Sequence, residues 1–254
     1  MFKVVKIKNN VYIIDTDDNS CSSVSPDTYD VLSGFIDFSS DGIMLLHHGS
    51  HNGIKGNIKP ESRSSCDFGT GFYTATLIDY ALSNIITEKR NGHGYYYGFL
   101  ADFNGLRVFD FKDDLRFWML YTAYNRGYID NIRQYNRLYQ MIQQLNEYDV
   151  IKGLVEDDRS AYAFGRFLSN AITDECLMEC LKYFDLGYQY VFKTEKACSH
   201  LGIAEIAEIQ GDEYNKLSSN KSKRLNEAKN AVEEIEEKYE GVGKTFRRLI
   251  KEYD

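Results

Sequence analysis

The chain lacks the long apolar segments that mark secreted and membrane proteins. It begins Met1-Phe2-Lys3 without the apolar core of a signal peptide, and no window approaches the roughly 18 uncharged apolar residues of a membrane span. Cysteine is also sparse, and its odd count of five predicts reduced structural thiols in a cytoplasmic protein. Cys176 and Cys180 share a predicted helix face, but no second Cys or His pair completes a zinc site, so we expect no metal.

The composition is that of an ordinary globular protein. Of the 254 residues, 43% are hydrophobic and 27% are charged, which allows one large domain with an appendage. The net charge of −8 argues against broad, charge-driven binding of nucleic acids, although a local basic groove is compatible with it.

The sequence pattern divides the chain into three segments. Residues 41–210 carry strand and helix patterns and form the main domain, and residues 1–40 precede it as an extension. Residues 211–254 form an amphipathic helical tail, and its long helix is predicted to end near Gly241. Its apolar stripe fits either docking on the protein's own domain or binding of a partner. The stripe consists of Leu217, Leu225, Ala228, Val232, Ile235 and Tyr239.

Hydrophobic periodicity predicts the secondary structure of the extension and the main domain. Asn104-Gly105 is a strong hairpin signal between two predicted strands. In the extension we expect a hairpin over 2–15, a polar loop over 16–29 and a helix over 26–35. In the main domain we expect strands at 43–47, 95–102, 106–111, 148–151, 189–192 and 204–209, and helices at 77–89, 113–125, 129–146, 159–169 and 174–184.

Two short motifs are the most informative part of the sequence. His47-His48-Gly49-Ser50 ends an apolar strand, and Phe68-Gly69-Thr70-Gly71-Phe72-Tyr73 is a glycine-spaced turn that leads into a helix pattern. Glycines in such a turn let the backbone pass close to a ligand. A strand-end histidine beside an aromatic face suits a flat, amide-bearing ring next to a sugar, as at the nicotinamide-ribose end of NAD.

The order of four motifs resembles a known superfamily. His48-Gly49-Ser50, Asp67 to Tyr73, Tyr148 to Ile151 and Gln189 to Ala197 resemble a bacterial domain-of-unknown-function family of the ADP-ribosyltransferase superfamily. The same pieces look like the NAD site of the poly-ADP-ribose polymerases. The resemblance implies an α+β fold with a split, bent antiparallel sheet and flanking helices, with NAD as the substrate.

The resemblance also implies roles for individual residues. His48 would bond a ribose hydroxyl, the Gly49 backbone would hold the nicotinamide carboxamide, Ser50 would support that amide or the ribose, and Tyr73 would stack on the ring. Each also has a plain structural explanation, as a strand-end, turn or core residue. The further residues expected to bind NAD are Arg63, Phe68, Gly69, Gly71, Phe72, Tyr80 and Asn84.

Two positions depart from the superfamily pattern. Gln189 stands where a glutamate is usual, and an amide can be neither a base nor an anionic partner for a developing cation. The run Glu156-Asp157-Asp158 could supply the missing carboxylate, with Asp157 as our candidate, or could simply cap a helix. Asn84 stands where relatives often carry an aromatic residue, a role that Tyr80 could take.

We therefore expect a mono-ADP-ribosyltransferase that cleaves NAD and modifies a macromolecule, either protein or nucleic acid. An NAD glycohydrolase and a catalytically weak NAD- or ADP-ribose-binding module are the alternatives. By resemblance, such bacterial enzymes often act as toxins in toxin–antitoxin or defence systems. An antitoxin or other partner protein would then bind through residues 1–40 or 211–254.

Overall fold

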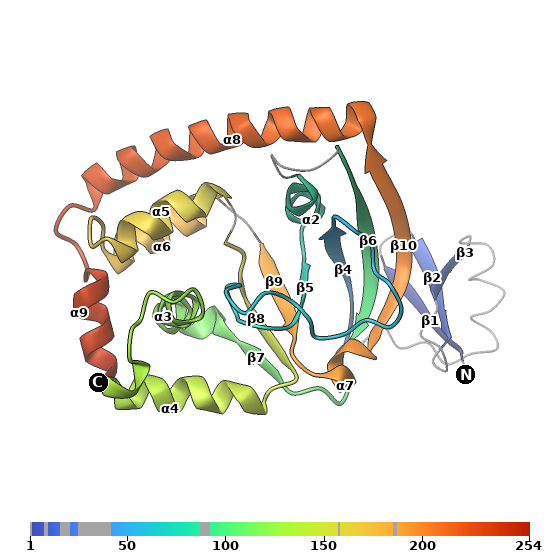
Figure 1. Ribbon diagram of the computed structural model, residues 1–254, viewed down its shortest axis with the longest axis horizontal. Coiled ribbons are helices and arrows are strands. Elements are labelled where there is room, and N and C mark those ends of the chain that lie inside the picture. Colours follow the sequence, from blue (N-terminus) through green and yellow to red (C-terminus); the bar gives the residue numbers. More distant parts are fainter. Residues whose placement is uncertain are drawn as a thin grey trace.

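The structure is a computed structural model that describes residues 2–7, 10–15, 21–24, 42–86, 92–156, 158–184 and 187–254. It combines two β-sheets with flanking helices (Figure 1). The small sheet contains β1 (Phe2–Ile7), β2 (Asn10–Asp15) and β3 (Cys21–Val24). The large sheet contains β4 (Ile43–Ser50), β5 (Phe72–Ala75), β6 (His93–Asp102), β7 (Val108–Asp110), β8 (Val150–Leu154), β9 (Tyr188–Phe192) and β10 (Leu201–Gln210).

The large sheet has the order β10-β6-β4-β5-β9-β8-β7, and every pairing is antiparallel except that of β7 with β8. The junction of β4 and β5 is the narrowest, because it consists of one residue pair, His47 with Ala75. Beyond this pair the two strands separate. The α+β class with a mostly antiparallel sheet is therefore as predicted.

The hairpin predicted at Asn104-Gly105 is wrong. The chain does turn there, and Gly105 has a positive φ of 74°. However, β6 lies between β10 and β4, whereas β7 lies at the opposite edge beside β8. Phe103 packs on β9, with its ring 5.2 Å from that of Tyr190. The packing of Phe103 on β9 directs the chain from β6 to the opposite edge of the sheet. This packing outweighs the local turn signal at Asn104-Gly105.

The small sheet matches one prediction for the extension and corrects another. β1 and β2 form the antiparallel hairpin expected over 2–15. The loop predicted over 16–29 is partly wrong, because residues 21–24 form β3, in which Ser23 pairs with Tyr12. This polar strand shows no apolar alternation and depends on β2 for its pairing. The helix predicted over 26–35 lies outside the described residues.

The two faces of the large sheet bury different cores. Strand side chains alternate between faces, so Val191 of β9 packs toward the helices while its neighbours Tyr190 and Phe192 pack on the other face. The helical side contains α3 (Leu115–Asn125), whose residues Phe117 to Ala123 are all buried. Among the described residues, the other α-helices of the protein, on either face, are α2 (Ile78–Ile85), α4 (Asn136–Gln144), α5 (Asp158–Leu168), α6 (Asp174–Phe184), α7 (Glu195–Cys198), α8 (Gly211–Lys238) and α9 (Phe246–Ile250).

The helix predicted over 129–146 is shorter than expected. Its ends form 3-10 turns over 132–134 and 145–147, with α4 between them. Asn131 adopts a left-handed conformation with φ of 49°, which an α-helix does not accommodate. Leu138, Ile142 and Leu145, which lie at helical spacing in the predicted range, are buried.

Helix α8 crosses the molecule from the end of β10 to α5 and α6 (Figure 1). Its residues Ala228, Val232 and Ile235 are buried in the main core, and Glu236 pairs with Arg166 of α5 at 2.5 Å. Of the two alternatives for the tail, its apolar stripe therefore docks on the protein itself. Among the helices of the described ranges, none is both long and apolar enough to cross a membrane.

Candidate functional site

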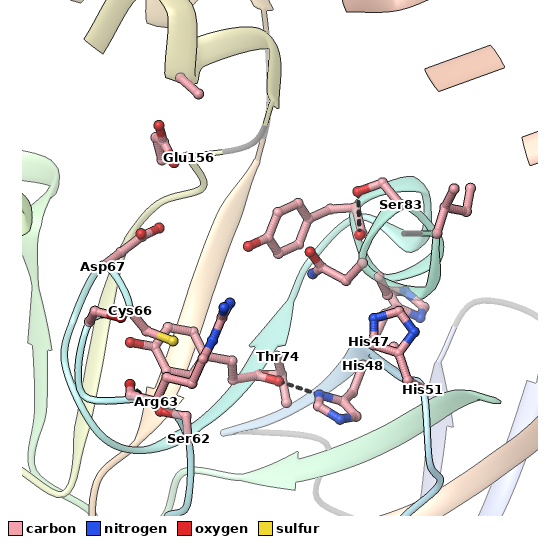
Figure 2. Close-up of a pocket in the computed structure, with 18 of the residues that line it drawn as sticks. His47, His48, His51, Ser62, Arg63, Cys66, Asp67, Thr74, Ser83 and Glu156 are labelled. Carbon is pink, nitrogen blue, oxygen red and sulfur yellow. Dashed lines mark hydrogen bonds between the residues drawn. The ribbon is translucent and has the colours of Figure 1, made fainter. Parts of the chain in front are cut away.

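Two adjoining cavities lie where β4 and β5 separate. Their volumes are about 580 and 550 Å³, within the range of small-molecule sites. His48, Gly49 and Tyr73 border both cavities. Figure 2 shows His47, His48 and His51 on one side of the larger cavity, with Asp67, Cys66 and Glu156 on the opposite side. Helix α2 contributes Tyr80, Ala81, Ser83 and Asn84 to its wall.

The ring of His48 is fixed by one hydrogen bond and one stacking contact. Nδ1 lies 2.7 Å from the Tyr73 carbonyl oxygen, and the ring stacks on Phe72 with a centroid distance of 4.5 Å. Because a carbonyl only accepts, Nδ1 carries the proton. Burial lowers the pKa of His48, against the raising effect of this hydrogen bond. His48 is therefore neutral at pH 7, with Nε2 as a hydrogen-bond acceptor.

The hydroxyl group of Tyr73 is bound to the turn that precedes it. It accepts a hydrogen bond from the Phe68 amide at 2.9 Å and donates one to the Gly69 carbonyl oxygen at 2.7 Å. Burial, followed by the charge of Asp67, raises the pKa of Tyr73 far above its ordinary value. The hydroxyl group is thus unsuited to proton transfer, while the ring borders both cavities.

The glycines of the two motifs are required by protein contacts. Gly69 has a φ of 70° and faces Asn125. A Cβ at Gly71 would lie 2.5 Å from Val191 Cγ1. A Cβ at Gly49 would lie only 1.9 Å from the Ala81 carbonyl oxygen, so glycine is what lets α2 approach β4. Of the three, Gly49 and Gly71 also border a cavity.

Lys193 secures the same turn from the end of β9. Its Nζ donates a hydrogen bond to the Phe68 carbonyl oxygen at 2.6 Å. Burial lowers the pKa of Lys193 to about 8, with a small opposing effect of Cys66. No pattern in the sequence indicated a role for this lysine.

A buried charged cluster forms the wall opposite the histidines. Arg126 Nε lies 2.9 Å from Asp67 Oδ1, and its terminal nitrogen Nη2 binds both Asp67 Oδ1 and Glu156 Oε2. Burial opposes the charge of Arg126, but the adjacent carboxylates raise its pKa, so it stays protonated. All three residues line the larger cavity.

Gln189 lies behind this wall and is fully buried. Its Nε2 donates hydrogen bonds to Asp67 Oδ2 at 3.1 Å and to the Leu154 carbonyl oxygen at 3.0 Å. These two acceptors fix the orientation of the amide. If the amide were flipped, its Oε1 atom would lie against two other oxygen atoms and no hydrogen bond could form. Within the described part of the chain, the buried Oε1 atom has no hydrogen-bond partner.

The structure brings together most of the residues that the sequence indicated. Phe68 is an exception, since it is fully buried in the core beside Phe111 and Tyr121. Gln189 contacts the cavity wall through Asp67, and Asp157 lies outside the described residues. The predicted residues that line one or both cavities are His48, Gly49, Ser50, Arg63, Gly71, Phe72, Tyr73, Tyr80 and Asn84.

Of the charged cluster, the sequence indicated only Glu156, within the run Glu156-Asp157-Asp158, as a possible carboxylate of the site. Asp67 stood inside a motif but had no role, and Arg126 carried no motif at all. The two residues are 59 positions apart, and no local pattern reveals a pair at that separation. An arginine at the end of a mostly buried helix was the one available signal, since a charge there requires a partner. Within the described ranges, no group of three or more His, Cys, Asp or Glu side chains could hold a metal ion.

The fold and the cavities define an α+β protein with a polar cleft at the divergence of two strands. Residues 44–203 match a family described as a protein of unknown function (DUF3990). Because the match covers more than half of the chain, the protein belongs to this family. The matched range includes every residue of the charged cluster and both motifs. No curated protein matches the chain.

Proposed function

We propose that the protein is a mono-ADP-ribosyltransferase that cleaves NAD and transfers ADP-ribose to a macromolecule. One observation carries the proposal: the neighbouring strands β4, β5 and β9 present His48, Tyr73 and Gln189 in that order. The register places His47 opposite Ala75, and Ala75 opposite Gln189. The resemblance implies a site formed by a histidine, a tyrosine and a glutamate, the last replaced here by Gln189, and the order of these strands supports it. The single-pair junction of β4 and β5 supports a split sheet of the ADP-ribosyltransferase kind.

The divergence of β4 and β5 also explains how both motifs reach one cleft. His48 stacks on Phe72, on one face of the sheet, whereas Tyr73 packs toward the helices on the other. Where the strands separate, side chains of both faces border the same space. The neutral His48 offers Nε2 to a ribose hydroxyl, and the Tyr73 ring offers a face for the nicotinamide.

Basic side chains on the neighbouring loop suit the diphosphate of NAD. Lys55 and Lys59 line the smaller cavity, and Arg63 lines the larger one. All three are exposed, as expected of groups that meet a charged ligand from solvent. Arg63 would bind phosphate oxygens with a planar, bidentate fork. Lys55 and Lys59 had no predicted role, although the lysine-rich composition of this loop was visible.

The test is a reaction with NAD labelled separately in the nicotinamide and the adenylate. We expect release of nicotinamide and transfer of the adenylate label to a macromolecule in a cell lysate, which protease or nuclease treatment then classifies. His48→Ala and Tyr73→Ala are expected to abolish both, whereas His93→Ala, an exposed histidine on β6, leaves both unchanged. Unchanged activity in both cavity variants would contradict the site.

A second candidate is a module that binds NAD or ADP-ribose with little turnover. The amide of Gln189, which stands where the superfamily has glutamate and is bound to Asp67, favours it. Binding of NAD without nicotinamide release would identify such a module. Nicotinamide release without label transfer would instead identify an NAD glycohydrolase.

A further inference from the structure

Gln189 uses only the donor end of its side-chain amide. The residue lies on β9 between Ala75 of β5 and Gly153 of β8, and it is fully buried. An amide nitrogen carries two hydrogen atoms, and Gln189 directs them to Asp67 Oδ2 and to the Leu154 carbonyl oxygen. The Oε1 atom, by contrast, has no hydrogen-bond partner among the described residues. The contacts that Gln189 makes here are therefore those of a donor.

Asp67 has a separate donor for each of its three oxygen atoms. Oδ2 accepts from Gln189, Oδ1 accepts from Arg126, and the main-chain oxygen accepts from Asn125 Nδ2 at 3.1 Å. Gln189 belongs to the sheet, whereas Asn125 and Arg126 lie at the end of α3. Asp67 is thus held from both sides, at a position that lines the larger cavity (Figure 2).

The glycine turn connects Asp67 to the ring of Tyr73. Asp67 directly precedes Phe68, whose amide donates to the Tyr73 hydroxyl group and whose carbonyl oxygen accepts from Lys193. A shift of Asp67 would therefore move the backbone groups to which the Tyr73 hydroxyl is bound. Because the Tyr73 ring borders both cavities, the same shift would alter the surface that a ligand meets.

On the basis of the proposed function, we propose that Gln189 is a positioning residue, whose amide donor holds Asp67 and the glycine turn in the geometry that binds NAD. The family resemblance implies a glutamate at this position, with a carboxylate that acts on the ligand. In this chain the side chain at position 189 faces two acceptors of the protein instead. Gln189 acts through Asp67, and the site requires an amide there.

The substitution Gln189→Glu would remove both donated hydrogen atoms at alkaline pH. An ionised carboxylate would set its oxygen atoms against Asp67 Oδ2 and the Leu154 carbonyl oxygen. Burial and the charge of Asp67 both raise the pKa of a carboxyl group at this place. The next charged groups are Arg126, which binds the other oxygen of Asp67, and Glu156, which binds Arg126. Below its pKa the introduced carboxyl group is protonated and can donate to Asp67, so the defect should lessen as the pH falls.

The experiment measures NAD affinity by calorimetry, and nicotinamide release, on the whole chain from pH 8.5 to 5.5. At pH 8, Gln189→Glu should bind NAD about tenfold more weakly than the wild type, and kcat should fall as well. The ratio of variant to wild type should approach unity as the pH falls. Because His48 titrates in both chains, this ratio cancels its contribution. Gln140→Glu is the matched control, since Gln140 is exposed on α4 and should change neither quantity.

Two further variants separate the loss of the donor from the gain of a charge. Gln189→Met keeps the length of the side chain without a donor or a charge, so it should fold and weaken NAD binding by the same factor at every pH. Asp67→Asn combined with Gln189→Glu exchanges donor and acceptor, because the new amide can donate to the new carboxylate. Its oxygen can still accept from Arg126. This double variant should recover part of the affinity that Gln189→Glu loses.

Three results would overturn the inference while leaving the proposed function intact. The first is an NAD affinity and a kcat at pH 8 in Gln189→Glu equal to or above those of the wild type, because the carboxylate would then act on the ligand. The second is unchanged NAD binding in Gln189→Met, which also decides the question if Gln189→Glu does not fold. The third is a double variant that binds NAD no better than Gln189→Glu. A wild-type chain that neither binds nor cleaves NAD would instead overturn the proposed function, and this inference with it.

Discussion

The hydroxyl group of Tyr73 donates a hydrogen bond to the carbonyl oxygen of Gly69, four residues earlier in the chain. The same hydroxyl accepts from the Phe68 amide, so one side chain closes the glycine turn while its ring borders the cavities. The ring and the hydroxyl of Tyr73 therefore have separable tasks.

Tyr73→Phe should lower stability more than ligand binding. The substitution leaves the Phe68 amide without its partner, which costs about 1–3 kcal/mol of unfolding free energy. The stacking face remains, so NAD affinity should change by less than a few-fold, whereas Tyr73→Ala should lose both. Urea denaturation and calorimetric titration measure the two effects. Loss of NAD binding at unchanged stability in Tyr73→Phe would show that the hydroxyl contacts the ligand directly.

Acid should destabilise the protein in part through His48. Burial holds the pKa of His48 below its ordinary value of 6.5. At a pH between the lowered pKa of the folded chain and 6.5, the unfolded chain binds more protons than the folded one. The free energy of unfolding therefore falls as the pH drops below 6.5. Urea midpoints measured from pH 7.5 to 5 should decline less steeply in His48→Gln. An equally steep decline in His48→Gln would contradict the assignment of this pH dependence to His48.

Lys193 should make the protein more stable at alkaline pH. Its pKa is about 8 in the folded chain and 10.5 ordinarily, so between these values the unfolded chain binds more protons. Stability contributed by this group therefore rises with pH across that window and is constant below it. Lys193→Met should remove the rise. An undiminished alkaline gain in Lys193→Met would contradict the assignment to Lys193.

Arg126 should stabilise the folded protein because its guanidinium neutralises the buried carboxylates of Asp67 and Glu156. Arg126→Met removes the guanidinium that binds both buried carboxylates, Asp67 and Glu156, which should cost about 3–5 kcal/mol of unfolding free energy. Adding Asp67→Asn and Glu156→Gln to the same chain should recover most of that loss. Chemical denaturation of the single and triple variants measures it. A triple variant no more stable than Arg126→Met would mean that packing of the arginine stem is the main effect.

Local patterns were sufficient for the elements whose stability is local. The helices at 159–169 and 174–184 and the strand at 189–192 could be predicted to within a residue or so, because their apolar spacing is decided over a few turns. The proximity of His48 and Tyr73 was expected from the resemblance alone, because the strand Phe72–Ala75 that carries Tyr73 was not predicted.

Features that depend on distant parts of the chain could not be predicted in this way. Asn104-Gly105 makes the turn that it indicates, but the pairing of β7 with β8 is decided by residues more than 40 positions away. The direction of the Gln189 amide depends on Asp67, which is 122 residues distant. A single sequence reveals neither the strand that pairs with β7 nor the orientation of the Gln189 amide, because the partner residues share no local periodicity.

Helix α2 is held between two parts of the chain. Gly49 of β4 lets it lie close on one side, and Ile85 of α2 packs with Tyr214 of α8 in a common core. A ligand that shifts α2 would therefore change the packing of the helical tail. Thermodynamic reciprocity requires the converse, so a loosened tail would change the affinity of the cavity by the same factor. Such a ligand and the tail would be energetically coupled, although the residues that line the two cavities all precede the tail in the chain.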